Sequence, residues 1–147
     1  MKGYLLDVNV LLALGWPNHI HHDSAHRWFQ QNRAKGWATC ALTQLSFVRL
    51  SANPRICPSP QTPQLAIAWL MQFTKLPRHM YWQEKAGGLA ADGLASIFAS
   101  VGHHEQVTDA FLVSVAEFNE GKVATFDLSL GRRFPAIAES IRVGAPV

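Results

Sequence analysis

The amino-acid sequence predicts an α/β fold in which helices cover both faces of a central parallel sheet. Three observations carry this prediction. Short apolar runs typical of strands alternate along the chain with segments of helical periodicity. The first of these runs has no polar side, as expected of a strand buried on both faces. The length of 147 residues suits one hydrophobic core, so a single domain spanning 1–147 is expected.

The strands are expected where short apolar runs end at a polar residue or a turn. The first run, Gly3 to Leu6, leads directly to Asp7, and apolar residues resume at once. Four further strands are expected at 37–40, 79–82, 122–126 and near 140–143.

The helices are expected between these strands, where apolar residues recur at helical spacing and helix-ending residues follow. Gly15 and Pro17 end the first helix, Pro54 stops the third, and Gly121 closes the long helix near the C-terminus. Four prolines make 54–63 a loop. The predicted helices span 8–14, 23–33, 42–51, 64–75, 89–99, 107–119 and 128–133.

The composition narrows the class of protein. No apolar run reaches about 18 residues, so no membrane span is expected, and Met1-Lys2 does not begin a signal peptide. Cys40 and Cys57 are too few and too isolated for a disulfide framework or a Cys-based zinc site. These features favour a cytoplasmic protein of bacterial type. The net charge of +3 suits a partner rich in phosphate or acid.

Asp7 is the first candidate site residue, because it stands where the first predicted strand ends. In open α/β sheets, ligands bind outside the carboxyl ends of the strands. A carboxylate at that edge is suited to holding a cation. The alternative is that Asp7 simply caps the helix that follows, since Asp is a favoured N-cap residue.

Two more aspartates fall at edges of the predicted pattern. Asp127 ends the fourth strand, and Asp109 lies in the first turn of the preceding helix, where the helix dipole favours a carboxylate. If the first and fourth strands are neighbours, all three acids converge at one edge of the sheet. Their repulsion would be relieved by Mg²⁺, which can activate water and neutralise phosphate charge. Taken singly, each acid could instead be a cap or a surface charge.

Four histidines cluster around the entry to the second predicted helix. They could bind a metal, or they could form a polar helix start with Trp28 and Phe29 facing inward. We favour the second interpretation, because no Cys accompanies the cluster. The histidines are His19, His21, His22 and His26.

In these segments the chain resembles the PIN-domain ribonucleases, specifically the VapC-type toxins of bacterial toxin–antitoxin pairs. The resemblance covers nearly the whole chain. Its more specific part is the order of Asp109 and Asp127 around a helix and a strand. The segments that carry it are 5–11 (LLDVNVL), 39–49 (TCALTQLSFVR), 51–54 (SANP), 102–104 (GHH), 107–110 (VTDA) and 124–127 (ATFD).

The resemblance implies a PIN-like domain with four to five parallel strands that cuts RNA endonucleolytically with Mg²⁺ or Mn²⁺. It also implies a cognate VapB-type antitoxin that blocks the site, and a homodimer. By motif position, Asp7, Asp109 and Asp127 would be the catalytic acids and metal ligands.

Several other residues of the motifs are expected near the acids. Asn9 would be a polar neighbour, unless its side chain makes only a local turn bond. Thr43 or Thr125 could orient ligands, or serve as a helix cap or strand residue. Arg49 could pair with an acid, touch RNA or remain solvated.

Gln44 departs from the family pattern, in which many members carry Glu at the matching position. Glutamine keeps one oxygen that can bind a metal but lacks the negative charge. Three carboxylates should hold a second divalent ion poorly, which still allows hydrolysis with one metal.

Two alternative functions follow from the sequence. One is a catalytically weakened PIN domain that binds RNA or an antitoxin, with Gln44 as its first sign. The other is a phosphoacceptor domain of the receiver type. Lys122 counts against the second, because it begins a strand, whereas a receiver carries its lysine late in the sheet.

Overall fold

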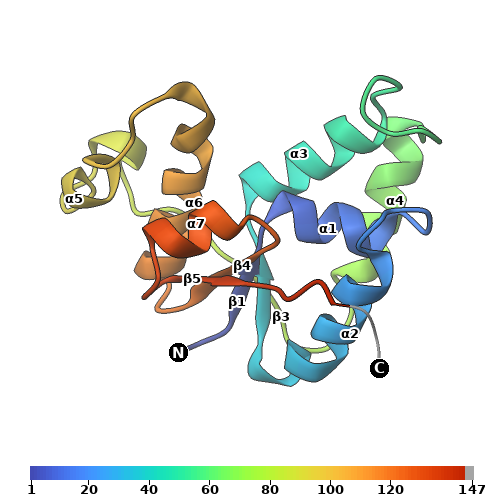
Figure 1. Ribbon diagram of the computed structural model, residues 1–147, viewed down its shortest axis with the longest axis horizontal. Coiled ribbons are helices and arrows are strands. Elements are labelled where there is room, and N and C mark those ends of the chain that lie inside the picture. The colour runs from blue at the N-terminus through green and yellow to red at the C-terminus, as the bar shows by residue number, and fades with distance from the viewer. Residues whose placement is uncertain (145–147) are drawn as a thin grey trace.

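The computed structural model describes residues 1–144, and its centre is one parallel sheet of five strands (Figure 1). The spatial order of the strands is β3-β2-β1-β4-β5. Leu5 of β1 is in register with Val123 of β4, so the first and fourth strands are neighbours, as the site prediction required. The strands are β1 (Tyr4–Leu6), β2 (Trp37–Thr39), β3 (His79–Tyr81), β4 (Lys122–Thr125) and β5 (Ala138–Ser140).

Helices cover both faces of this sheet, which confirms the predicted class. One face packs against α1 (Val8–Gly15), α2 (His22–Asn32), α3 (Ala41–Ser51) and α4 (Pro63–Phe73). The other packs against α5 (Ala95–Phe98), α6 (Val107–Phe118) and α7 (Leu128–Arg133). Short 3-10 turns occupy Arg33–Lys35, Gly88–Ala90 and His104–Gln106. No helix within residues 1–144 is long and apolar enough to span a membrane.

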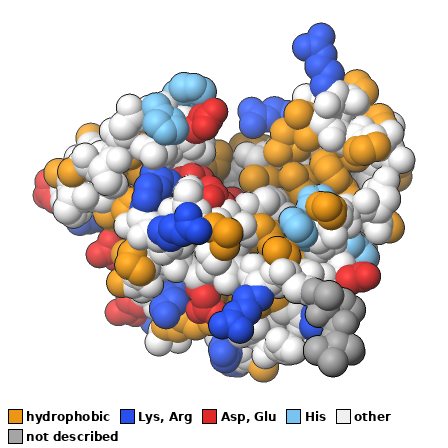
Figure 2. Space-filling view, in the orientation of Figure 1, with side chains coloured by type: hydrophobic (Ala, Val, Ile, Leu, Met, Phe, Trp, Pro, Cys, Tyr) orange, Lys and Arg blue, Asp and Glu red, His pale blue; other side chains and the backbone are white. Residues whose placement is uncertain are grey.

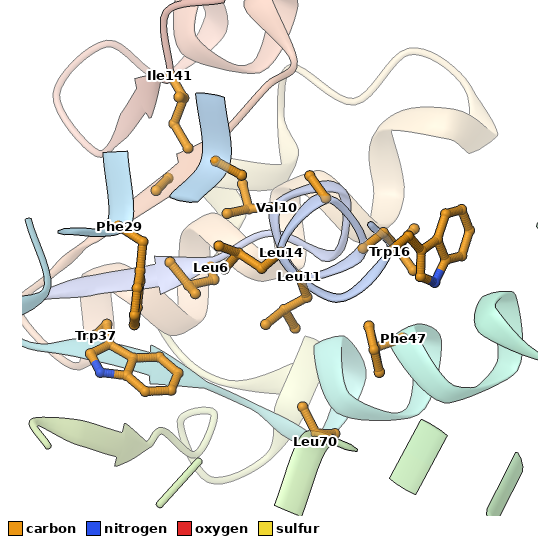
Figure 3. Packing of buried hydrophobic residues seen from close by; sticks show 14 of the residues in the cluster. Leu6, Val10, Leu11, Leu14, Trp16, Phe29, Trp37, Phe47, Leu70 and Ile141 are labelled. Atoms are coloured by element: carbon orange, nitrogen blue, oxygen red, sulfur yellow. The ribbon is translucent and has the colours of Figure 1, made fainter. Parts of the chain in front are cut away.

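The two hydrophobic cores arise from the alternation of side chains along each strand. In β1, Tyr4 and Leu6 point to the α1–α4 face, whereas Leu5 points to the other face. Figure 3 shows Leu6 close to Leu11 of α1, with Phe47 of α3 and Leu70 of α4 in the same cluster. These contacts hold the end of β1 and the start of α1 firmly in place.

Two predicted elements differ in the structure. The predicted helix over 89–99 is wrong: a 3-10 turn covers Gly88–Ala90, and only Ala95–Phe98 is α-helical. Gly93 interrupts the segment with a φ of +85°, a conformation outside the right-handed helix. The last strand covers Ala138–Ser140 rather than 140–143, because β5 can pair only along β4, which ends at Thr125.

The direction of the strands determines where a ligand can reach the sheet. From β1 the chain moves outward through β2 and β3, and then returns to the other side of β1 with β4 and β5. Such a reversal of strand order opens a crevice at the carboxyl ends of the two central strands. Asp7 directly follows β1 and Asp127 comes two residues after the end of β4, so both lie at this crevice.

Candidate active site

Asp7 links β1 to α1 and is only 5% exposed. Its Oδ1 accepts a hydrogen bond of 2.7 Å from the backbone N–H of Val8, so the side chain does cap α1. Its Oδ2 accepts a second bond of 2.7 Å from the hydroxyl of Thr125 on β4. The cap and the position at the sheet edge are therefore compatible, because each involves a different carboxylate oxygen.

The pKa of Asp7 is raised to about 6, chiefly by burial and in part by the negative charges of Asp109 and Asp127. The hydrogen bonds from Thr125 and Val8 lower this pKa and so oppose the rise. The pKa of Asp109 is also raised, first by burial and then by the charge of Asp127. The three carboxylates named from the sequence therefore influence one another across the crevice.

Asp127 is held at the other side of this crevice as the N-cap of α7. Its Oδ1 accepts bonds from the backbone N–H groups of Ser129 at 2.8 Å and Leu130 at 3.4 Å. The positive end of a helix favours a carboxylate. This leaves the second oxygen of Asp127 without a role in the cap.

Thr125 connects the acids from a fully buried position at the end of β4. Its hydroxyl donates to Asp7 and accepts from the side-chain amide of Asn9 at 3.2 Å and the backbone N–H of Asp127 at 3.0 Å. These three bonds use the full capacity of a hydroxyl group. Asn9 also accepts from the N–H of Phe126 at 3.2 Å, so its contacts reach across the sheet rather than around a local turn.

Arg133 is a site residue that the sequence analysis missed. Its Nη2 lies 3.2 Å from Oδ2 of Asp109, and about four-fifths of each side chain is buried. Its Nε and Nη1 are buried without a hydrogen-bond partner within the part of the chain that the structure describes. The arginine follows Asp127 by six residues, but this spacing alone does not show that α7 brings it to the start of α6.

The other residues named from the sequence lie around α3. Thr43 accepts a 3.0 Å bond from the N–H of Cys40 and so caps this helix. Gln44 donates 2.9 Å to the hydroxyl of Thr39, which also lies 2.8 Å from Nε2 of His79. Arg49 is exposed in the last turn. Among residues 1–144, none of Thr43, Gln44 and Arg49 makes a hydrogen bond to the three acids.

The donor set fits a divalent ion that prefers oxygen, because all three side chains are carboxylates. Within residues 1–144, however, no three His, Cys, Asp or Glu side chains lie close enough together to form a ready-made metal cluster. Asp109 is instead drawn to Arg133, whose positive charge balances part of the acidic crevice.

Two histidines of the N-terminal cluster bind the C-terminal end of α1. His22 Nδ1 lies 2.7 Å from the carbonyl oxygen of Ala13, and His26 Nε2 lies 2.9 Å from that of Leu14. The last carbonyls of a helix have no partner within the helix, so these contacts satisfy them.

The molecular surface is charged on one side of the crevice and hydrophobic on the other (Figure 2). Figure 2 shows a hollow between the part of the molecule that carries α5 and α6 and the part that carries α3 and α4. Acidic and basic side chains lie together on the first side, and hydrophobic side chains dominate the second.

The chain is similar to several ribonucleases of Mycobacterium tuberculosis. It is 43% identical to ribonuclease VapC39 over 126 residues, which cover 86% of this chain and 89% of the relative. It is 40% identical to ribonuclease VapC38 over 84% of each chain, and 39% identical to ribonuclease VapC44 over 86% and 87%. No protein-family model matches the chain.

Solved structures share the fold at much lower sequence identity. The structure of FitAB bound to an IR36 DNA fragment has a TM-score of 0.60 and 16% identity, covering 97% of this chain and 98% of that one. The crystal structure of FitAcB from Neisseria gonorrhoeae has a TM-score of 0.50 and 16% identity, covering 92% and 95%. Because the ribonuclease relatives match over most of both chains and the fold agrees, this chain belongs to the VapC family of PIN-domain ribonucleases.

Proposed function

We propose that this protein is a toxin of the VapC type that cleaves RNA endonucleolytically in the presence of Mg²⁺ or Mn²⁺. The observation that carries the proposal is the place of Asp7 and Asp127 after the neighbouring strands β1 and β4, with the charges of Asp109 and Asp127 both acting to raise the pKa of Asp7. The names of the relatives support ribonuclease activity, and the carboxylate donors support a hard divalent ion.

The residues of this chain have separable tasks in the proposed reaction. Asp7, Asp109 and Asp127 would hold the ion, which supplies an activated water and neutralises charge on the phosphate. Thr125 orients Asp7, and the first turn of α7 orients Asp127, so both carboxylates are positioned before a ligand arrives. Arg133 keeps a positive charge beside Asp109, where it offsets the mutual repulsion of the acids.

The decisive experiment is cleavage of total RNA by purified protein, with Mg²⁺ or with excess EDTA, followed by mapping of the cut sites. The triple variant Asp7→Asn, Asp109→Asn, Asp127→Asn should retain its fold and lose cleavage. Asp23→Asn is the matched control, because Asp23 is an exposed aspartate outside the crevice. Full cleavage in EDTA or by the triple variant would refute the proposal.

We further propose that a VapB-type antitoxin inhibits the protein and that the chain forms a homodimer. The solved relatives of the same fold are FitAB, bound to a DNA fragment, and FitAcB, and these two-part names support a partner protein for this fold. A hydrophobic groove between α3 and α4 supports a protein contact on that side, where Leu45, Ile67 and Met71 are 70%, 45% and 58% exposed.

Purification from the native operon tests these partners. We expect a complex of this chain with a small basic or apolar-tailed protein, and we expect its RNA cleavage to be weaker than that of the free chain. Light scattering of the free chain should give the mass of two copies. A chain that purifies alone as a monomer and is harmless when overproduced would contradict both the proposed antitoxin and the proposed homodimer.

A catalytically weakened binding module is the second candidate function. The observation in its favour is that Gln44 donates to Thr39 and supplies no fourth negative charge. In that case RNA or antitoxin would bind, but Mg²⁺ and Mn²⁺ would produce no cut above the level of the triple variant.

A further inference from the structure

We propose that the pocket between α2 and β5 binds a backbone phosphate of single-stranded RNA, separate from the phosphate that is cut. The inference rests on the proposed ribonuclease function and adds a substrate-binding subsite to it. The pocket has a volume of about 410 Å³. Its lining includes Ser24, Arg27 and Gln31 of α2, and Glu139, Ser140 and Arg142 of β5 and the chain that follows it.

Two arginines from distant parts of the chain bring positive charge to this pocket. Arg27 belongs to α2 and Arg142 follows β5 by two residues, and both side chains are exposed. Within residues 1–144 neither arginine forms an ion pair with a carboxylate. An exposed guanidinium group without a carboxylate partner keeps its donors available, and its planar fork matches the oxygens of a phosphate.

The acid in the pocket, Glu139, is already bound by a buried tyrosine. Its Oε2 accepts a hydrogen bond of 3.1 Å from the hydroxyl of Tyr4 on β1. Burial and the charge of Glu139 raise the pKa of Tyr4 to about 12, so this hydroxyl keeps its proton and remains a donor. Two guanidinium groups and one carboxylate leave the pocket with a surplus of positive charge, which favours an anionic ligand.

Uncharged polar groups complete a lining that suits phosphate and ribose. Ser24, Arg27 and Gln31 follow one another at spacings of three and four residues, which places them on one face of α2. On the other side of the pocket, β5 is the last strand of the sheet within residues 1–144, so one row of its backbone N–H and C=O groups has no neighbouring strand. Hydroxyl, amide and backbone N–H groups, together with arginine, are the donors with which proteins bind phosphate oxygens and sugars.

The C-terminal end of β5 links the pocket to the acids. Ser140 lines the pocket, and its hydroxyl donates at 3.4 Å to the backbone carbonyl of Asp127. Ile141 also lines the pocket, and its N–H donates at 2.7 Å to the carbonyl of Thr125, whose side chain holds Asp7. The wall of the pocket therefore touches the backbone that carries the acids, and a nearby phosphate of an RNA strand bound at the acids lies within reach of it.

The free edge of β5 could also receive a peptide strand, but the pocket favours RNA. β5 has only three residues, Ala138–Ser140, and so offers few main-chain hydrogen bonds to an added strand. The lining of the pocket is mainly polar and charged, whereas the centres of protein–protein contacts are depleted in charged side chains. The net charge of +3 of the whole chain also suits a ligand rich in phosphate.

The test measures binding of a short single-stranded 2′-O-methyl oligoribonucleotide by fluorescence anisotropy, in EDTA and again with Ca²⁺, so the result does not depend on cleavage. Arg27→Gln and Arg142→Gln should each weaken binding about fivefold at about 0.1 M salt and hardly at all near 1 M, because one phosphate contact contributes about 0.7 to the slope of log affinity against log salt. The double variant should bind about 25-fold more weakly at the lower salt concentration. Arg55→Gln is the matched control, because Arg55 is an exposed arginine in the loop after α3 and its loss changes the net charge equally.

A set of oligonucleotides, each with one neutral methylphosphonate in place of a phosphate, makes the test specific to a single contact. At least one of these replacements should weaken binding to the original protein and leave binding to the double variant unchanged. Such coupling identifies the phosphate that the two arginines hold. If every replacement weakens binding to both proteins equally, the arginines hold no phosphate and the subsite is overturned.

The outcomes separate the subsite from the proposed nuclease. Unchanged affinity and salt slope in both arginine variants, or equal losses in Arg55→Gln, would overturn the subsite even if the protein cleaves RNA. A double variant that binds RNA like the original protein but no longer co-purifies with a partner protein would refute the RNA subsite and make the pocket a protein contact. The expected losses in a protein that cuts no RNA would preserve the subsite and refute the nuclease.

Discussion

At the scale of single residues, Asp7 is buried, which disfavours its negative charge, yet it accepts hydrogen bonds that favour that charge. Its carboxylate is 5% exposed and lies near two other acids, so its negative charge is unfavourable in the folded protein. The bonds from Val8 and Thr125 offset part of this cost and fix both oxygens. Such a residue is expected to contribute more to binding a cation than to folding.

Asp7→Asn should therefore stabilise the protein at pH 7 while abolishing cleavage. The pKa of Asp7 in the folded protein, about 6, lies above its ordinary value of 3.8. Its contribution to stability is thus complete below about pH 4 and is lost as pH rises through 6. The shift in pKa corresponds to a destabilisation of the folded protein of about 3 kcal/mol at pH 7. Asparagine removes this destabilisation but gives back about 1 kcal/mol, because it cannot accept both hydrogen bonds.

Urea unfolding of both proteins at pH 4, 5 and 7 measures this effect. The free energy of unfolding of Asp7→Asn should exceed that of the original protein by about 1–2 kcal/mol at pH 7, and this difference should shrink toward pH 4. A variant that is less stable at pH 7, or a difference that does not change with pH, would contradict the pKa argument.

Arg133→Gln should tighten binding of Mn²⁺ to the crevice about three- to tenfold, because a competing positive charge beside Asp109 is removed. The unfolding free energy should fall by no more than about 1 kcal/mol, because the loss of the ion pair is offset by the removal of two buried arginine nitrogens that have no hydrogen-bond partner among residues 1–144. Arg132→Gln is the matched control, because Arg132 is exposed on the same helix. Calorimetric titration of Mn²⁺ decides, and equal affinities for the variant and the original protein would show that Arg133 does not compete with the ion.

At the scale of secondary-structure elements, the start of α3 is tied to β2 and β3 by one chain of hydrogen bonds. Gln44 donates to Thr39, and Thr39 bonds to His79, whose pKa is lowered by burial. The position that carries a glutamate in many family members is therefore occupied here by an amide that contacts the sheet. A substitution at Gln44 can therefore test whether the start of α3 is part of the metal site.

Gln44→Glu should strengthen Mn²⁺ binding by roughly one to three decades if this position faces the ion, because a unit charge about 4 Å away contributes about 1–4 kcal/mol. The same variant should reach half-maximal cleavage at lower Mn²⁺. Gln72→Glu on α4 is the control, since Gln72 is exposed. Equal calorimetric affinities for Gln44→Glu and the original protein would leave Gln44 as a structural residue only.

At the scale of the whole molecule, the crevice depends on close contact between strands from distant parts of the chain. Gly121 precedes β4, and a Cβ atom there would lie 2.2 Å from the ring of Trp82 and 2.7 Å from the carbonyl oxygen of Gly3. The turn before β4 therefore requires glycine so that β4 can lie beside β1.

Gly121→Ala should destabilise the protein by about 1–3 kcal/mol through overpacking. It should also reduce cleavage at temperatures near the shifted unfolding midpoint. Gly102→Ala is the control, because its added Cβ atom would meet only the end of the Gln106 side chain at 3.7 Å. Thermal unfolding of the two variants gives the comparison, and equal midpoints would show that the Trp82 ring can move aside.

Local sequence patterns were enough to predict the order of strands and helices, the parallel sheet and the placement of Asp7 and Asp127 after β1 and β4. These features can be read locally, because a buried strand must be apolar along its length and a helix must start and stop at particular residues. The segment 89–99 was mispredicted because its apolar residues suggested a helix that Gly93 interrupts.

The meeting of side chains at the crevice, by contrast, depends on the three-dimensional packing of the chain. The pairing of Arg133 with Asp109, the bonds of Thr125 to Asp7 and Asn9, and the stacking of His21 on Phe126 join residues that are 24 to 118 positions apart. No local periodicity encodes these contacts. They arise because packing on the two faces of the sheet sets the relative positions of α2, α6, α7 and β4.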